Sequence, residues 1–199
     1  MSVRTPEMPG SNPEAQKEEL KARIREFLQI PEVRRIEIQN LAQAVLVAIR
    51  EQPASNIQVR PTENLAVILG ALRSLGLETR YYPAFGYVDG ESEEPEDYTQ
   101  VLFATSKLTL SHFIMFMDEW KEGSWNDPEM AKDYGYFMGF PKTAVAAFAA
   151  LLPNIPPLHD DPEEPVYPPF GRFRYSEENF TQEFQFLLNR NIHFYQMSP

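Results

Sequence analysis

The chain has 199 residues, a net charge of −11 and a pI of about 4.8, and this acidic balance argues against the clustered Lys and Arg that nucleic-acid binding requires. Its hydrophobic content of 43% and aromatic content of 13% exclude a disordered chain and allow a substantial core. The absence of cysteine excludes disulfides, thiolate nucleophiles and Cys-based metal sites.

The N-terminal residues 1–13 contain three prolines and a glycine but few apolar side chains, so we expect a flexible tail followed by a single domain over 14–199. No secretory signal is recognised there, and the longest nearly apolar run, 143–152, is too short to cross a bilayer. We therefore expect a soluble, cytoplasmic protein with no membrane partner.

Three amphipathic helices are predicted in the first third of the chain. The first ends before Pro31, which opens the second, and the second has the clearest 3.6-residue spacing of apolar side chains, over 38–49. A polar turn is predicted at 53–61. Thr62 is then the expected N-cap of the third helix, and Gly76 is expected to end it.

Two strands, at 77–88 and 98–105, are predicted to pair with each other. The first contains three tyrosines and one threonine, and the second is expected to alternate in polarity. The loop between them, 89–97, carries six acidic residues and no basic one, which is typical of a solvated connection. It lacks the ligand spacing of an EF-hand, so no calcium site is predicted and its role stays open.

The second half of the chain is predicted to be mainly helical. Thr109 or Ser111 is expected to cap a largely buried helix, and a short helix is expected to begin at Asp127. Proline makes up seven of the seventeen residues of 153–169, which predicts an extended crossing. A final helix is expected to begin at Ser176 and to turn four apolar side chains inward: Phe180, Phe184, Leu187 and Leu188. A third strand is expected to follow it, at 191–197.

The stretch 133–153 is the centre of this arrangement. Pro141 stands where a helix can begin, because its ring fixes φ near the helical value and the missing N–H is no loss in a first turn. A buried stripe is predicted along that helix: Val145, Phe148, Ala149 and Leu152. Together the elements predict an α+β fold, a mainly helical single domain with a small antiparallel β-sheet.

The start of this central helix offers a candidate ligand-binding site formed by Gly139, Lys142 and Thr143. The segment 135–143 is not a P-loop, because Pro141 precedes the lysine where a glycine is needed. Free amides at a helix N-terminus, with a lysine and a hydroxyl, can still bind a small anion. The alternative, which we favour, is a tightly packed turn between two helices.

The motif Gly139-Phe-Pro141-Lys-Thr143-Ala144 resembles one in an uncharacterised prokaryotic family whose members carry Gly-Tyr-Pro-x-Cys-Cys ahead of a helix. The resemblance spans about residues 65–150. Because Thr143 and Ala144 replace both cysteines, it implies no thiol or metal chemistry here, and the family supplies no function.

Catalytic groups are not recognisable in the sequence, so whether the chain is an enzyme is left open. His112, His159 and His193 are far apart and form no two-histidine helical pair, and we predict no metal site and no cofactor. The leading hypothesis is a noncatalytic interaction or ligand-binding protein with an unknown protein or small-molecule partner. The alternative is an enzyme acting on a small anionic molecule at the Gly139 to Thr143 helix start, which requires groups such as Asp133, His112 and His159 to converge there.

Overall fold

The structure is a computed structural model that describes residues 12–36, 38–59, 64–82, 99–121, 127–151 and 178–197. Its elements, in chain order, are α1 (Pro13–Gln29), the 3-10 helix η1 (Val33–Arg35), α2 (Ile38–Ala48), β1 (Ala54–Val59), α3 (Leu65–Ser74), β2 (Glu78–Tyr82), β3 (Thr99–Ala104), α4 (Lys107–Lys121), α5 (Pro128–Phe137), α6 (Lys142–Leu151) and α7 (Phe180–Met197). The predicted α+β class, mainly helical with a small antiparallel sheet, is confirmed.

The sheet has the order β1-β3-β2, and both pairings are antiparallel. The predicted pairing of the 77–88 and 98–105 segments is confirmed, with Tyr81 opposite Val101. The polar turn predicted at 53–61 was wrong, because 54–59 forms β1, the second neighbour of β3, with Ile57 opposite Val101. Polar side chains such as Asn56 are not typical of a strand, so the sequence of this segment does not indicate β1. Backbone pairing with β3 stabilises the strand instead.

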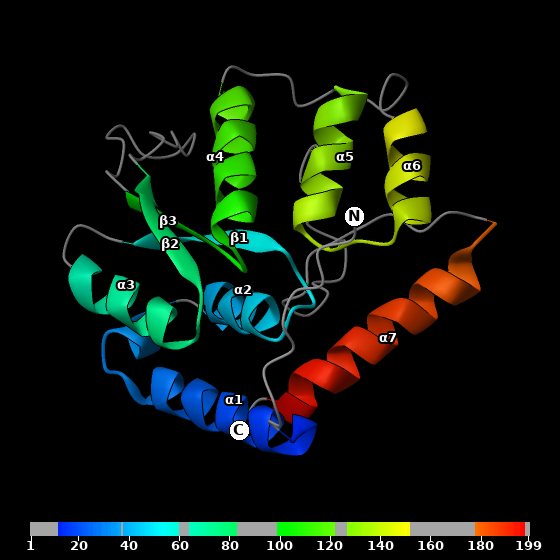
Figure 1. Ribbon diagram of the computed structural model, residues 1–199. Helices are drawn as coiled ribbons and strands as arrows, with labels where there is room; N and C mark the ends of the chain where they lie inside the picture. Colours follow the sequence, from blue (N-terminus) through cyan, green and yellow to red (C-terminus); the bar gives the residue numbers. More distant parts are fainter. Residues whose placement is uncertain are drawn as a thin grey trace, which may run out of the picture.

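Strand β3 is buried on both faces, so the sheet is the middle of three layers (Figure 1). Val101 and Phe103 on one face belong to a core shared with α1, α2 and α3. Leu102 and Ala104 on the other face belong to a core shared with α4 and α5. The alternation in polarity expected for 98–105 was therefore wrong for 101–104, where four consecutive apolar residues are buried because both faces of the strand are covered.

Several predicted boundaries moved. Asn64 caps α3 by accepting from the Val67 N–H, while Thr62 lies outside the described residues. Ser106 accepts from the Thr109 N–H, so it caps α4 in place of the expected Thr109 or Ser111. Asn12 caps α1, so this helix starts at the end of the expected tail. The acidic loop 89–97 lies outside the described residues.

The stripe predicted on α6 is only partly buried. Ala149 is buried, but Val145 and Phe148 are half-buried, and Leu152 lies outside the described residues. Helix α6 is the outermost of the row α4, α5 and α6 (Figure 1), and it packs so closely on α5 that a Cβ at Gly135 would lie 2.4 Å from Val145 Cγ2. Val145 and Phe148, at the rim of this stripe, therefore stay partly accessible.

The third strand predicted at 191–197 was wrong, because α7 continues to Met197. The orientation predicted for this helix was also wrong. Phe180, Phe184 and Leu188, expected to point inward, are 51%, 49% and 41% exposed, and Leu187 is half-buried.

None of the helices in the described ranges is long and apolar enough to cross a membrane.

Three helices end in the same hydrogen-bonded turn, with a left-handed residue just after the cap. It is Gly76 (φ 81°) after α3, Gly139 (φ 66°) after α5 and Arg50 (φ 65°) after α2. The predicted role of Gly76 is confirmed. For a residue with a side chain this conformation costs roughly 1–2 kcal/mol, so Arg50 occupies a position that glycine would fill at lower cost.

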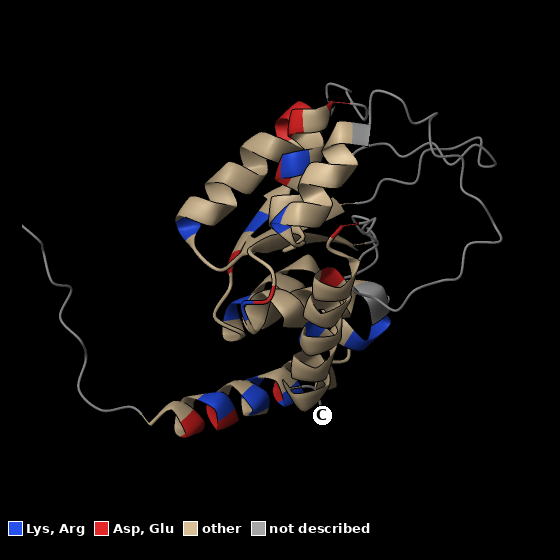
Figure 2. Cartoon of the chain, turned by 90° about the vertical axis from the view of Figure 1, so that its right-hand side faces the viewer, with Lys and Arg blue, Asp and Glu red and all other residues tan. Residues whose placement is uncertain are grey.

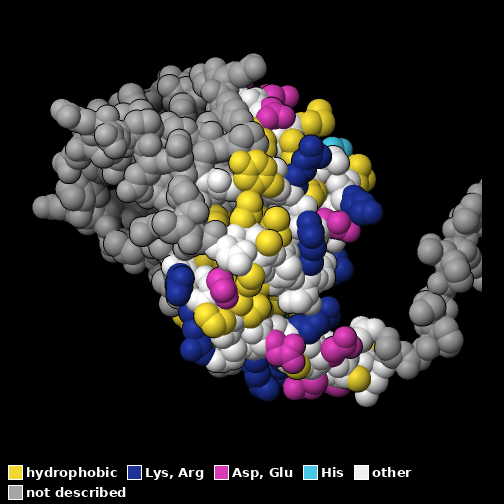
Figure 3. Space-filling model, turned by 90° about the vertical axis from the view of Figure 1, so that its left-hand side faces the viewer, with side chains coloured by type: hydrophobic (Ala, Val, Ile, Leu, Met, Phe, Trp, Pro, Cys, Tyr) yellow, Lys and Arg dark blue, Asp and Glu magenta, His cyan; other side chains and the backbone are white. Residues whose placement is uncertain are grey.

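Charge is unevenly divided along the chain. The described ranges hold 14 of the 18 Lys and Arg residues and 14 of the 29 Asp and Glu residues. Acidic and basic side chains are interspersed along the lower edge of the face shown in Figure 3, where α1 lies. The described body is therefore close to neutral, and the net charge of −11 comes from the remaining segments.

Alanine substitution at three glycines should give three different results in a urea titration. Gly139→Ala should destabilise most, because the backbone conformation is left-handed and the new Cβ would lie 2.4 Å from the Glu51 carbonyl oxygen. Gly76→Ala shares the conformation but meets only Arg23 Nη1 at 3.5 Å, so it should cost about 1–2 kcal/mol, and Gly139→Ala roughly 1–3 kcal/mol more.

Gly70→Ala is the matched control. It lies inside α3 with nothing within 4 Å of an added Cβ, so it should stabilise by about 0.4–1 kcal/mol. Equal costs at Gly139 and Gly76 would contradict the close approach of Gly139 to the turn after α2.

Candidate functional site

The corner predicted to bind an anion lies between α5 and α6, against the turn that follows α2. The Gly139 N–H donates to the Tyr136 carbonyl at 3.0 Å, and the Phe140 N–H donates to the Gly135 carbonyl at 2.9 Å. A Cβ at Gly139 would collide with Glu51 O. Glycine is thus required by the backbone at 139, and its amide is already used within the turn.

Lys142 and Thr143 lie in the first turn of α6 and are exposed. The Thr143 hydroxyl donates to the Glu183 carboxylate of α7, with 2.6 Å between Oγ1 and Oε1, and Glu183 is only 1% exposed. Helix N-termini favour negative charge, and here an internal carboxylate lies beside one. Binding of an external anion by Gly139, Lys142 and Thr143 stays a prediction.

Arg190 of α7 joins this corner to the turn after α2. Its Nη1 donates to the Met138 carbonyl at 3.0 Å, and its Nη2 donates to Gln52 Oε1 at 3.1 Å. Gln52 Nε2 in turn donates to the Ala54 carbonyl at 2.9 Å. Arg190 is 1% exposed and Gln52 is 0% exposed, so one buried guanidinium links three segments that are far apart in sequence.

Burial lowers the pKa of Arg190 to about 10, while the nearby Glu51 carboxylate acts in the opposite direction. The guanidinium therefore stays charged at neutral pH, and its hydrogen bonds offset part of the cost of removing it from water. Glu51 also contacts His193 of α7, with 2.5 Å between Oε1 and Nδ1. We refer to Glu51, Gln52, Arg190 and His193 as the Arg190 network.

The inward side of α7 is unusual because it carries the only two charged residues of the helix. Positions spaced by three and four face the rest of the molecule: Glu183, Leu187, Arg190, Phe194 and Met197. The sequence-based prediction missed Glu183, Arg190 and Gln52. The available signal was a heptad-spaced stripe with two charges, but a second, purely apolar stripe on the same helix competed with it.

The outward side of α7 carries no charge. Its apolar residues, which we call the outward face, are Phe180 (51% exposed), Phe184 (49%), Leu188 (41%), Ile192 (47%) and Tyr195 (65%). Figure 2 shows the contrast with α1, where blue and red alternate, whereas α7, which faces the viewer, is tan along most of its length. The rings of Phe180 and Phe184 stack, with centroids 6.0 Å apart.

His112 and Asp133 line one small cavity of about 270 Å³ between α4 and α5, together with Glu119 and Tyr136. The residues of the Gly139 to Thr143 corner are not among those that line it, and His159 lies outside the described residues. Within the described ranges no group of three His, Asp or Glu residues could hold a metal ion. The convergence that the enzyme hypothesis requires is therefore not seen among His112, Asp133 and the corner.

No protein-family model, no curated protein and no solved structure matches this chain. The resemblance to the family with the Gly-Tyr-Pro-x-Cys-Cys motif stays a prediction.

Thr143→Val should destabilise the protein by about 1.5–3 kcal/mol, because the buried Glu183 carboxylate loses a hydrogen-bond donor. Thr143→Ser, which keeps the hydroxyl, should recover most of this loss. Lys142→Ala should stay within about 0.5 kcal/mol, as at an ordinary surface position. Urea titrations of the three variants measure these differences.

A second measurement concerns anions at the same corner. We expect phosphate and sulfate to give wild type no thermal shift beyond that of matched ionic strength, because Glu183 already lies beside the Thr143 hydroxyl. A shift that is lost in the Lys142→Ala, Thr143→Val double variant would instead establish the corner as an anion site.

Proposed function

We propose that this chain is a noncatalytic interaction protein, that its binding surface is the outward face of α7, and that a second copy of the chain binds there. The observation that carries the proposal is the reversed polarity of this helix. Glu183 and Arg190 are buried, while five large apolar side chains on the opposite side are 41–65% exposed. Apolar surface gathered on one side of an element is typical of an interaction site.

The position of the outward face is fixed by the interior. Rotation of α7 to bury Phe184 and Leu188 would expose or disconnect Arg190, which holds the Met138 carbonyl and Gln52, and would break the contact between Glu183 and Thr143. The apolar side chains therefore have no inward position available to them. A partner that covers them gains the favourable transfer of this surface from water.

A second copy suits this surface because the outward face is free of charge and self-complementary. Phe180, Phe184, Leu188 and Ile192 are four residues apart and form one ridge on the helix. Two such ridges in antiparallel contact, with a two-fold axis at Leu188, place Phe184 opposite the partner subunit's Ile192. The outward side of α7 carries no Asp, Glu, Lys or Arg, so this helix desolvates no ion in the contact.

The enzyme hypothesis has less support. His112 and Asp133 share a cavity, but the Gly139 to Thr143 corner does not line it, and the Gly139 amide and Thr143 hydroxyl are engaged inside the protein. The corner also packs against the Arg190 network, so its residues have a structural role.

We expect wild type to sediment as a dimer at micromolar concentrations and Leu188→Glu to sediment as a monomer. The substitution places two carboxylates against each other at the two-fold axis, and a charged pair of like sign in a desolvated contact is strongly unfavourable. Sedimentation velocity over a hundredfold range of concentration measures the change, and far-UV circular dichroism checks that the variant is folded.

Gln182→Glu is the matched control, since it adds the same charge to an exposed position on the polar side of the same helix and should leave the dimer intact. Because the chain has no cysteine, Leu188→Cys also introduces a unique thiol, which should form a disulfide-linked dimer on mild oxidation, whereas Gln182→Cys should not. A monomeric wild type, or a Leu188→Glu variant that still dimerises, would overturn the second copy as the partner.

A further inference from the structure

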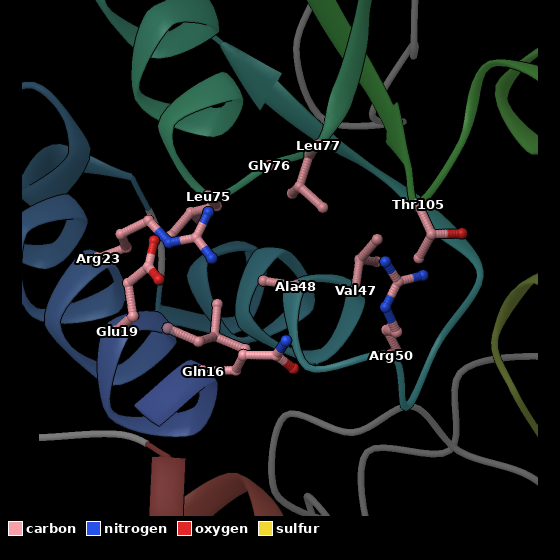
Figure 4. A pocket seen from close by; sticks show the side chains of 11 residues that line it. Gln16, Glu19, Arg23, Val47, Ala48, Arg50, Leu75, Gly76, Leu77 and Thr105 are labelled. Carbon is pink, nitrogen blue, oxygen red and sulfur yellow. The ribbon is translucent and has the colours of Figure 1, made fainter. Parts of the chain in front are cut away.

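The cavity between α1, the end of α2, the turn from α3 to β2 and the end of β3 has a volume of about 410 Å³. This is within the usual range for small-molecule sites. Val47, Ala48 and Leu77 give it an apolar wall, and Arg23 and Arg50 reach it from different elements (Figure 4). It is separate from the outward face of α7 and from the Gly139 corner.

Arg23 extends from α1 toward the turn at Gly76 (Figure 4). Its Nε is buried and has no hydrogen-bond partner among the described residues. Gly76 leaves space beside the guanidinium, because even an added Cβ would stand 3.5 Å from Nη1. Arg23 therefore brings unused hydrogen-bond donors to the cavity.

Arg50 reaches the cavity from the turn after α2, and Figure 4 shows its guanidinium beside Thr105. It holds the left-handed position that glycine fills in the two other turns of this kind. In the part of the chain that the structure describes, its guanidinium makes no hydrogen bond or ion pair. Arg50 is also exposed, so its guanidinium is accessible to an external partner.

We infer that this cavity binds a small aliphatic dicarboxylate, with one carboxylate at Arg23 and the other at Arg50. A guanidinium matches a carboxylate through two parallel N–H···O bonds, so two guanidinium groups on opposite sides of a cavity suit a molecule that is anionic at both ends. Thr105 also lines the cavity at the Arg50 end. The methylene groups of the ligand lie along Val47, Ala48 and Leu77.

Two features of the cavity oppose the binding of an anion. They make the cavity selective for a ligand with two carboxylates. Glu19 lies on the Arg23 side and competes with the ligand for that guanidinium (Figure 4). The C-terminal ends of α2 and α3 also point partial negative charge at the cavity. A single carboxylate therefore binds weakly, and engagement of both arginines is required.

Within the described ranges, net charge does not oppose such binding. The described ranges hold equal numbers of acidic and basic residues, and charges beyond about 8 Å are screened at physiological salt. Local groups such as Arg23, Arg50 and Glu19 decide the affinity.

The test is isothermal titration calorimetry of the full chain with the unbranched dicarboxylates from malonate to pimelate. We expect an optimum at one chain length, and at least tenfold weaker binding of the monocarboxylate of equal length. Arg23→Gln and Arg50→Gln should each weaken the best dicarboxylate at least tenfold, and Glu19→Gln should strengthen it several-fold. Arg25→Gln, an exposed position on α1 that does not line the cavity, is the control and should change nothing.

Arg50→Gly separates binding from folding. It should raise the melting temperature of the ligand-free protein, because glycine relieves the left-handed backbone, and should abolish the dicarboxylate-induced shift. If the two arginines serve only to offset the helix C-termini, Arg50→Gly will lower the melting temperature and no dicarboxylate will bind wild type. That result, or equal affinity for monocarboxylates and dicarboxylates, overturns the inference.

Discussion

The buried guanidinium of Arg190 is the interaction on which the arrangement of this protein depends. Hydrogen bonds from one side chain hold the end of α5, through the Met138 carbonyl, and the turn after α2, through Gln52. A charged group at this depth tolerates little displacement, because loss of either acceptor leaves unpaired polar atoms away from water. Helix α7 is therefore fixed in its rotation about its own axis, and the position of its apolar side chains follows from that.

The same constraint relates the two regions proposed to bind partners. Glu183 and Arg190 set which side of α7 faces water, so the outward face is a consequence of polar contacts in the interior. The proposed dicarboxylate cavity lies at the C-terminal end of α2, where Arg50 follows the helix and Glu51 begins the Arg190 network. Arg50 and Glu51 are neighbours in sequence, yet one side chain serves an open cavity and the other a packed contact.

Local sequence signals predicted the helices and the β2–β3 pairing because these depend on spacing, caps and turn residues within a few positions. Strand β1 was missed because Ser55, Asn56 and Gln58 have low strand propensity, and only its pairing with β3 identifies it. The rotation of α7 was missed because an apolar stripe and a charged stripe run along the same helix, and the carbonyl, amide and hydroxyl that stabilise the charges belong to residues 40 to 138 positions away. The Arg23 and Arg50 cavity had no local signal, since its walls come from four separated elements.

The unequal division of charge along the chain has a consequence for its behaviour in solution. The isoelectric point of about 4.8 belongs to the whole chain, but the excess of acidic residues lies outside the described ranges, which hold 14 acidic and 14 basic residues. Retention on an anion-exchange column at neutral pH therefore depends chiefly on the acidic excess that those segments carry.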